Sequence, residues 1–198
     1  MPDFVRAKPI MLPKYNAMTK RIRPKTLSSK TIYRDSHIRV KHDVLEVDSF
    51  SWNQVYLEWH HKNAVCIIPF EHNGVFLVRQ YRHAVSRYLW QFPGGLMEPN
   101  ISEMNMARKE LLEETGFVAE KLRKIGTISP EPGLTSANIF VYVATGLQKK
   151  NTQIEKSEIG MEVKFFPIAT VRKMIQQGKI CCGITLSAYL LFDLDKTS

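Results

Sequence analysis

The sequence of 198 residues has few cysteines and no long apolar run. Its three cysteines are an odd number without a regular spacing, which excludes a disulfide framework and favours a reducing compartment. A membrane-spanning helix needs about 20 consecutive apolar residues, and no such run or secretory signal is found. The hydrophobic content of 44% argues against an intrinsically disordered chain. We therefore expect a soluble, cytoplasmic, globular protein without a membrane partner.

Acidic residues are scarce relative to basic ones, with 19 Asp and Glu against 28 Lys and Arg, and the net charge is +9. A charge of this size suggests a polyanionic partner, because clustered basic side chains attract phosphate groups. However, residues 1–34 hold nine basic side chains and one acidic side chain, so they carry +8 and the other 164 residues carry +1. The basic N-terminal arm is either a phosphate-binding tail or a solvated extension, and a nucleic acid could bind only through this arm.

The chain divides into three parts. Residues 1–29 contain four prolines and seven basic residues without a helical or strand period, which predicts a flexible basic arm. Residues 30–61 show short alternating runs that are typical of strands, and they predict a small N-terminal β subdomain. Residues 62–198 mix strand and helix patterns and predict an α/β or α+β layered domain.

Strand and helix patterns can be assigned to residue ranges. Strands are expected at 30–33, 37–47, 54–60, 64–69, 75–80, 125–128, 139–144 and 161–166. Helices are expected at 102–115, 168–177 and 184–194, with Ser102 as the N-cap of the first. In that helix Met104, Ala107 and Leu111 recur at helical spacing, so we expect them to face the core.

Three glutamates lie on one face of the first predicted helix. Glu110, Glu113 and Glu114 are three to four residues apart or adjacent, so they fall within a single turn. Carboxylates this close repel one another unless a cation lies between them, and Mg²⁺ prefers such oxygen ligands. An ordinary acidic surface is the alternative interpretation. The Gly94-Gly95 turn before the helix favours the metal site, because glycines let the backbone approach a metal or a phosphate closely.

The segment from Gly95 to Phe117 resembles the sequence box of the Nudix hydrolases, G-x5-E-x7-R-E-U-x-E-E-x-G-U, where U is a bulky apolar residue. Seven of nine defined positions match, namely Gly95, Glu110, Leu111, Glu113, Glu114, Gly116 and Phe117. Ile101 replaces the first Glu of the box, and Lys109 replaces its Arg, which keeps the charge but loses bidentate geometry. The resemblance implies a Nudix-type α/β/α sandwich with a mixed sheet.

The resemblance extends over residues 30–194 and is closest to the branch that hydrolyses ADP-ribose and nucleoside diphosphate sugars. It is carried by residues 78–82, by the loop from Ser129 to Ser136 and by residues 178–188. Pro132 follows Gly116 by sixteen residues, a recurrent mark of members that cleave ADP-ribose. Two features depart from this branch: Gln91 stands where a Glu is usual, and residues 136–138 lack its acidic pair.

The resemblance also implies an activity and a set of site residues. The activity is metal-dependent hydrolysis of the diphosphate of ADP-ribose or a related nucleoside diphosphate sugar, with two to three Mg²⁺ or Mn²⁺ ions, in a homodimer formed through residues 30–61. The implied metal ligands are Glu110, Glu114, the Leu96 carbonyl, and Glu113 as a ligand or close neighbour. The implied general base is Glu158, with Glu155 second, and Glu113 is also a catalytic candidate. The implied substrate contacts are Arg79 and Arg82 for phosphate, Trp52 and Tyr56 for the base, and Pro132.

Other interpretations stay open at this point. Ile101, Lys109 and the basic arm are compatible with a non-hydrolytic Nudix-fold module that binds a nucleotide or RNA, or with a hydrolase of capped or triphosphorylated RNA. Trp52 and Tyr56 fit a core or dimer interface equally well. Cys66 is expected to be a buried thiol, and the adjacent Cys181 and Cys182 are too close for an easy disulfide ring.

Overall fold

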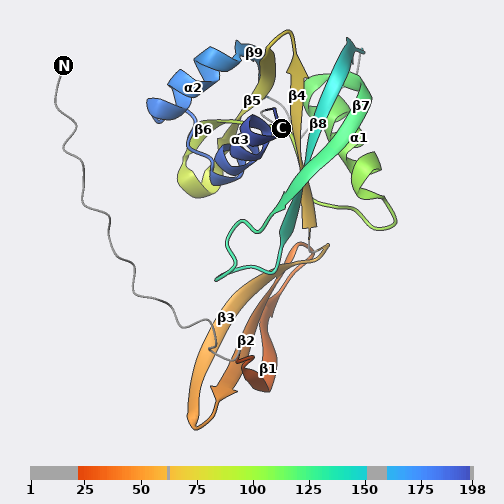
Figure 1. The fold of residues 1–198 in the computed structure, drawn as a ribbon. Coiled ribbons are helices and arrows are strands. Elements are labelled where there is room, and N and C mark those ends of the chain that lie inside the picture. The colour runs from red at the N-terminus through yellow and green to blue at the C-terminus, as the bar shows by residue number, and fades with distance from the viewer. Residues whose placement is uncertain (1–21, 62, 151–159, 197–198) are drawn as a thin grey trace, which may run out of the picture.

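The computed structural model describes residues 22–61, 63–150 and 160–196. The strands there are β1 (Lys25–Arg34), β2 (Ile38–Val47), β3 (Phe50–Trp59), β4 (Asn63–Glu71), β5 (Gly74–Arg82), β6 (Arg87–Gln91), β7 (Phe117–Ile128), β8 (Asn138–Lys149) and β9 (Glu162–Pro167). The helices are η1 (His83–Val85, 3-10), α1 (Glu103–Thr115), α2 (Ile168–Gln176) and α3 (Gly183–Asp195). Figure 1 shows a body of strands and helices above a separate sheet of β1, β2 and β3. The expected arm, up to residue 21, lies outside the described residues.

Strand β4 lies at the centre of the body and is covered on both faces. It pairs in parallel with β8 over residues 63–69. Successive side chains of a strand point to opposite faces. Val65 and Ile67 accordingly belong to one buried cluster, while Cys66 and Ile68 belong to another. The continuous apolar run of β4 is therefore explained by burial on both sides.

The helices cover the two faces of this sheet. On one face α1 contributes Met106, Ala107 and Leu111 to the cluster around Val65 and Ile67. On the other face α2 and α3 complete the cluster around Cys66; their buried residues there are Ile168, Val171, Met174, Ala188, Tyr189 and Phe192. The α/β/α sandwich with a mixed sheet is confirmed by this arrangement. The buried position of Cys66 is confirmed as well.

Strand β5 leaves β4 soon after the turn that joins them. The two strands pair only at Phe70 with Val75 and Glu71 with Gly74, after which β5 pairs with β6 on one edge and β9 on the other. The separation opens one edge of β4 to other partners. The segment that follows β6 fills this edge, and it carries the glycine turn of the predicted site.

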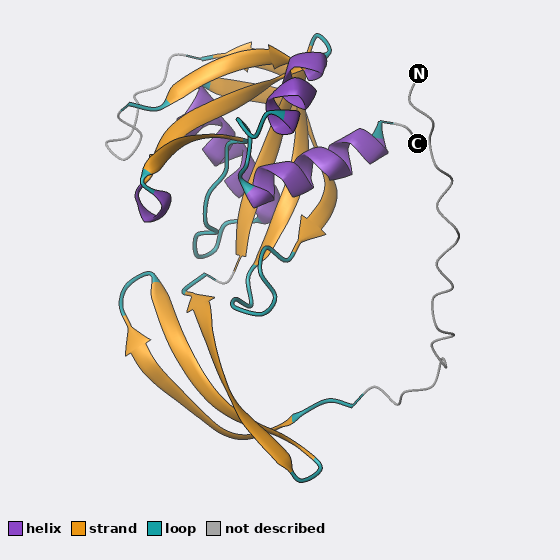
Figure 2. Cartoon of the chain, turned by 90° about the vertical axis from the view of Figure 1, so that its left-hand side faces the viewer, coloured by secondary structure: helices purple, strands orange, loops and turns teal. Residues whose placement is uncertain are grey.

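The N-terminal sheet is a single antiparallel layer in the order β1-β2-β3. Asp43 is the one buried residue in these three strands. The sheet curves away from the body, as Figure 2 shows. It is joined to the body by Leu57, whose N–H donates to the Leu134 carbonyl at 2.7 Å, and by the Gln54 side-chain amide, which donates to the Gly133 carbonyl at 3.2 Å.

Several element boundaries differ from the sequence predictions. β1 begins at Lys25, inside the expected arm, β6 was not expected, and β7 begins at Phe117 rather than at residue 125. Met104 was expected in the core but is 44% exposed, whereas Met106 is 1% exposed. Periodicity identifies the face of a helix but not how far along the helix the neighbouring sheet covers it. Among the described residues, no helix is both long and apolar enough to cross a membrane.

Candidate functional site

The glycine turn is held flat against the open edge of β4. The Val65 N–H donates to the Gly95 carbonyl and the Met97 N–H donates to the Asn63 carbonyl, both at 2.9 Å. Because alternate backbone groups of an extended segment point in opposite directions, the carbonyl of Leu96 points away from β4. A backbone oxygen is thereby presented at the site where the sequence predicts a metal ligand.

Two of the three predicted glutamates reach this turn from α1. The Gly94 N–H donates to Glu114 Oε2 at 2.8 Å. A Cβ atom on residue 95 would lie 2.2 Å from Glu110 Oε1, so the carboxylate of Glu110 occupies space that only glycine leaves open. At Gly94 a Cβ would lie 2.1 Å from the Val65 carbonyl oxygen, and φ is +155°. Both glycines are therefore required for the approach of turn, strand and helix.

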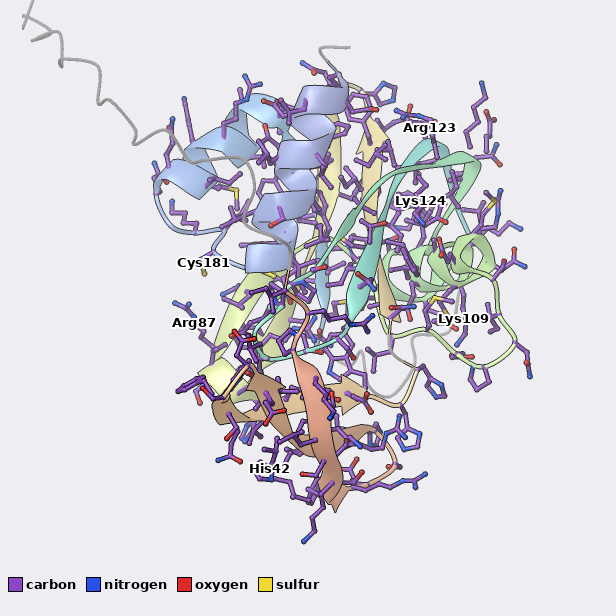
Figure 3. The ribbon with its side chains drawn as sticks, turned by 60° about the horizontal axis from the view of Figure 1, so that its bottom comes forward. His42, Arg87, Lys109, Arg123, Lys124 and Cys181 are labelled. Carbon is purple, nitrogen blue, oxygen red and sulfur yellow. The ribbon has the colours of Figure 1, made fainter. Side chains whose placement is uncertain are left out.

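The third glutamate is held by Lys109, the residue that replaces the arginine of the box. The Lys109 ammonium lies 3.6 Å from Glu113 and 2.5 Å from Glu98. The hydrogen bond to Glu98, together with the nearby carboxylates, raises the pKa of Lys109. Although an ammonium cannot form the bidentate pair of a guanidinium, it bridges two carboxylates here and ties the loop before α1 to the helix. Figure 3 shows Lys109 at the α1 side of the body.

The donor set at the turn consists of hard oxygen ligands. The carboxylates of Glu110 and Glu114 and the backbone at Leu96 are the type of ligand that Mg²⁺ and Mn²⁺ prefer. Within the described residues, no group of three or more His, Cys, Asp or Glu side chains is gathered closely enough to hold a metal ion by itself. Because its ligands are oxygen atoms, the site fits a divalent cation in donor chemistry, with two carboxylates at the turn and Glu113 beside Lys109.

A cleft of about 410 Å³ opens beside the glycine turn. Its wall includes Gly95 and Leu96 from the turn, Arg82 from β5, Gln91 from β6 and Cys182 at the start of α3. The Arg82 Nε–H donates to Gln91 Oε1 at 2.7 Å. The remaining wall is largely apolar, as expected for a pocket that binds a small organic molecule with a few placed polar groups.

The two arginines that were expected to bind phosphate lie on opposite faces of β5. Arg82 lines the cleft, whereas Arg79 lies 3.6 Å from Glu162 and over the rings of Tyr88 and Trp90. Residues 79 and 82 are three apart, and side chains of a strand alternate with a period of two. Of the two arginines, only Arg82 lines the cleft, and the joint arginine clamp stays a prediction.

The expected base-binding residues are also separated. Tyr56 and Pro132 line a second hollow of about 250 Å³ between β3 and the loop before β8. Trp52 lines neither hollow and instead stacks on Phe50, with ring centroids 5.9 Å apart. Burial, followed by the charge of Asp43, raises the pKa of Tyr56.

The remaining candidate residues are Glu155, Glu158, Gln91 and Cys182. Glu155 and Glu158 lie outside the described residues. Gln91 and Cys182 line the cleft but were not predicted as site residues, since their contact joins positions 91 residues apart. The replacement of a usual Glu by Gln91 was the one available signal in the sequence.

Comparison with known proteins identifies the family of the chain. The family model described as the NUDIX domain matches residues 60–180, which is more than half of the chain. The chain belongs to the Nudix family. The matched region holds the glycine turn, α1 and the cleft-lining residues between Ala64 and Ile139, whereas Trp59 and the lining residues from Cys182 onward lie outside it. The Nudix box of this chain is the segment that brings Glu110 and Glu114 to β4.

The chain is also similar to individual members of the family. The chain is 31% identical over 137 residues to an ADP-ribose pyrophosphatase of Mycobacterium tuberculosis (strain ATCC 25618 / H37Rv), covering 66% of this chain and 64% of that protein. It is 27% identical over 171 residues to the ADP compounds hydrolase NudE of Escherichia coli (strain K12), covering 85% and 91% of the two chains. A crystal structure of an ADP compounds hydrolase superposes with a TM-score of 0.76 at 25% identity, covering 87% of this chain and 93% of that chain.

Proposed function

We propose that this Nudix protein hydrolyses the diphosphate bond of ADP-ribose or a related nucleoside diphosphate sugar, giving a nucleoside monophosphate and a sugar phosphate. The observation that carries the proposal is the placement of the Glu110 and Glu114 carboxylates against the Gly94-Gly95 turn, whose glycines line the cleft. Similarity to relatives named for ADP-ribose and ADP compounds supports this substrate class.

Four groups would hold two to three Mg²⁺ or Mn²⁺ ions: the carboxylates of Glu110, Glu114 and Glu113, and the carbonyl of Leu96. When bound, such cations supply a water of lowered pKa and neutralise the charge of the diphosphate. Arg82 would donate to a phosphate oxygen from the opposite wall of the cleft, since a guanidinium presents several N–H donors to an anion. The apolar part of the cleft would exclude bulk water around the reacting bond and strengthen these charge interactions.

The general base in this proposal is Glu158, with Glu155 as second candidate. Both are outside the described residues, so the proposal rests on their place in the sequence before β9. Glu113 is the third candidate; its carboxylate lies 3.6 Å from the Lys109 ammonium, on the same face of α1 as the two other glutamates.

We also propose that the base of the substrate is bound by Tyr56 and Pro132, and that a second copy of the chain completes the molecule. The aromatic ring of Tyr56 and the ring of Pro132 line the same hollow, which offers an apolar surface for a nucleobase. Among the described residues, no second layer covers the N-terminal sheet, which supports a homodimer formed through it.

A substrate panel tests the proposed reaction. Purified protein is incubated with Mg²⁺ or Mn²⁺ and with ADP-ribose and several nucleoside diphosphate sugars, and the products are separated by chromatography. We expect formation of a nucleoside monophosphate with at least one of these compounds and none after a chelator is added. Salt-dependent RNA binding without any turnover would overturn the proposal in favour of a binding module.

The substitution Glu114→Gln tests the metal role of the box. The amide oxygen still accepts the Gly94 N–H, so the fold should persist, while the lost charge should lower kcat on the order of 100-fold. Circular dichroism and a melting curve check the fold. Glu120→Gln, a change on the exposed part of β7, is the matched control and should leave turnover unchanged. Full activity of Glu114→Gln would contradict the proposed site.

A further inference from the structure

A chain of hydrogen bonds runs along the cleft wall from β5 through β6 to α3. Arg82 Nε donates to Gln91 Oε1 at 2.7 Å, and Gln91 Nε2 donates to the sulfur of Cys182 at 3.0 Å. All three residues line the cleft beside the glycine turn. Gln91 is 9% exposed, so its polar atoms depend on these two partners rather than on bulk water.

The strand register explains why the first two residues meet. In the pairing of β5 with β6, Arg82 lies opposite Arg87 and Val78 opposite Gln91. Paired residues share a face, and positions separated by two share it as well, so Arg82 and Gln91 point to the same side of the hairpin. Arg79 points to the other side. The long arginine side chain can therefore turn toward Gln91 along the cleft wall.

The hydrogen bonds that join Arg82, Gln91 and Cys182 allow only one assignment of donors and acceptors. A guanidinium can only donate, so the oxygen of the Gln91 amide must face Arg82 and its NH₂ group must face Cys182. The sulfur of Cys182 must then accept. A glutamate at position 91 would present oxygen to both neighbours and would require the thiol to donate. With Gln at position 91, the amide oxygen faces Arg82 only while the sulfur of Cys182 accepts a hydrogen bond from the amide NH₂ group.

The surroundings of Cys182 suit an acceptor. Burial raises the pKa of the thiol, but the polar groups of Thr185, Gln91 and Ile184 outweigh burial and bring the pKa of Cys182 below its ordinary value. The neighbouring Cys181 differs: its sulfur accepts from Arg87 Nη2 at 3.4 Å, and neither residue lines the cleft. Figure 3 shows Cys181 and Arg87 together at the start of α3. Of the two adjacent cysteines only Cys182 lines the cleft, so Cys181 provides a matched control.

We propose that Gln91 and Cys182 are positioning residues that hold the Arg82 guanidinium toward the diphosphate in the cleft, and that an alkylated Cys182 weakens substrate binding. The inference rests on the proposed hydrolysis of a nucleoside diphosphate sugar. Arg82 is exposed and has several rotatable bonds, so without the acceptor on Gln91 it must be ordered anew each time substrate binds. The positioning acts on binding and not on the reacting atoms.

Steady-state kinetics with ADP-ribose test the positioning role. We expect Gln91→Ala and Cys182→Ala each to raise KM about three- to tenfold while kcat changes less than about twofold. Cys182→Ser should keep KM near the value of the unsubstituted protein, because the serine hydroxyl oxygen accepts a hydrogen bond from the Gln91 amide. Cys181→Ala should leave KM unchanged. The double variant Gln91→Ala with Cys182→Ala should be no worse than the single Gln91→Ala.

Two results would overturn the positioning role. The first is an unchanged KM in Cys182→Ala. This variant leaves the buried Gln91 in place, so its KM is informative even when Gln91→Ala does not fold. The second is an effect of Cys181→Ala as large as that of Cys182→Ala, which would indicate a general disturbance at the start of α3. Melting curves of all variants separate loss of fold from loss of binding.

Alkylation tests whether substrate binding depends on the sulfur of Cys182, and it does so without a measurement of turnover. Iodoacetamide forms a carbon–sulfur bond with the cysteine thiolate as iodide leaves, and peptide mass spectrometry reports which cysteine has reacted. Calorimetry then gives the Kd of ADP-ribose in the Glu114→Gln background. We expect protein labelled at Cys182 to bind about three- to tenfold more weakly and protein labelled only at Cys181 to bind normally. Equal binding of both labelled forms would overturn the inference.

The two proposals can fail separately. Turnover with KM and Kd independent of Cys182 would leave the hydrolase intact and overturn the positioning role. Binding that depends on Cys182, without turnover by the unsubstituted protein, would overturn the hydrolase and retain the positioning role. An absence of both turnover and binding of ADP-ribose would overturn both.

Discussion

At the scale of single residues, Gly95 determines where the carboxylate of Glu110 can lie. A methyl group on residue 95 would be 2.2 Å from Glu110 Oε1, so Gly95→Ala must displace that side chain. A displacement of about 1 Å in a catalytic group can cost on the order of 100-fold in rate. We predict a loss of turnover of this order together with weaker Mg²⁺ binding by calorimetry.

The glycine substitution needs a control for the fold. At Gly133 an added Cβ would have no neighbour within 4 Å, so the melting temperature of Gly133→Ala should stay near that of the unsubstituted protein. If Gly95→Ala keeps both its metal affinity and its turnover, the close approach of Glu110 to the turn has no role in the reaction.

The position of a site residue could be predicted from the sequence where its interactions are local along the chain. The glutamates of α1 could be placed together because helical spacing is a local property. The opposite directions of Arg79 and Arg82 also follow from a local rule, the period of two in a strand, although both were expected to reach phosphate. The contact of Gln91 with Cys182 depends on tertiary packing between β6 and α3, which no local pattern contains.

At the scale of elements, the start of α1 depends on one serine. The Ser102 side chain accepts from the Asn105 N–H at 3.3 Å, which satisfies one of the backbone donors at the helix start. We predict that Ser102→Ala lowers the free energy of unfolding by about 1 kcal/mol, measured by urea denaturation. Ser102→Asp should restore most of this stability, and equal losses in both variants would contradict the capping role.

The junction of β7 with α3 should give a measurable pH dependence of stability. Arg123 donates to both carboxylate oxygens of Asp195, at 2.8 and 2.5 Å. This hydrogen bonding lowers the pKa of Asp195 in the folded protein. A lowered folded pKa stabilises the protein above the ordinary pKa, and this contribution is lost as the pH falls through the folded value.

Asp195→Asn tests that dependence. Arg123 is exposed and Asp195 is partly exposed, so solvent screening limits the expected loss of stability at pH 7 to about 0–1 kcal/mol. The difference between the two proteins should shrink as the pH is lowered from about 5 towards 2. Melting curves across this range provide the measurement. A difference that grows on acidification would contradict the assigned ion pair.

Element prediction succeeded where apolar residues dominate and failed where polar residues occupy strands. β4 and β8 were predicted because they are continuous apolar runs, and α1 was predicted because its apolar residues recur at helical spacing. The first half of β7 was missed because Glu120, Lys121 and Arg123 make it look like a loop, although its pairing with β8 satisfies the backbone. β6 was missed because it is short and runs directly into the Pro93 turn.

At the scale of the whole molecule, the N-terminal sheet should be the dimer interface. Register places Val40, Val44, Val55 and Leu57 on one face of this sheet. Val55 is 46% exposed in the single chain, so it can be changed without disturbing a core. We predict that Val55→Asp shifts the protein from dimer to monomer, measured by size-exclusion chromatography with light scattering.

A substitution on the opposite face controls for general effects on the sheet. Thr31 pairs with Lys41 and is exposed, and Thr31→Asp should leave the dimer intact. A monomeric unsubstituted protein, or equal dissociation by both variants, would contradict the interface. The hollow formed by Tyr56 and Pro132 lies beside β3, so substrate affinity should be compared in the two variants as well.

The two-sided burial of β4 has a consequence for the tolerance of the gene to insertions and deletions. Adding or removing one codon between Ala64 and Ile68 would exchange the residues that face α1 with those that face α3. The same change would move the strand edge that holds Gly95 and Leu96, so core and site would be lost together. Length variants among relatives should therefore be confined to loops and be absent from this strand.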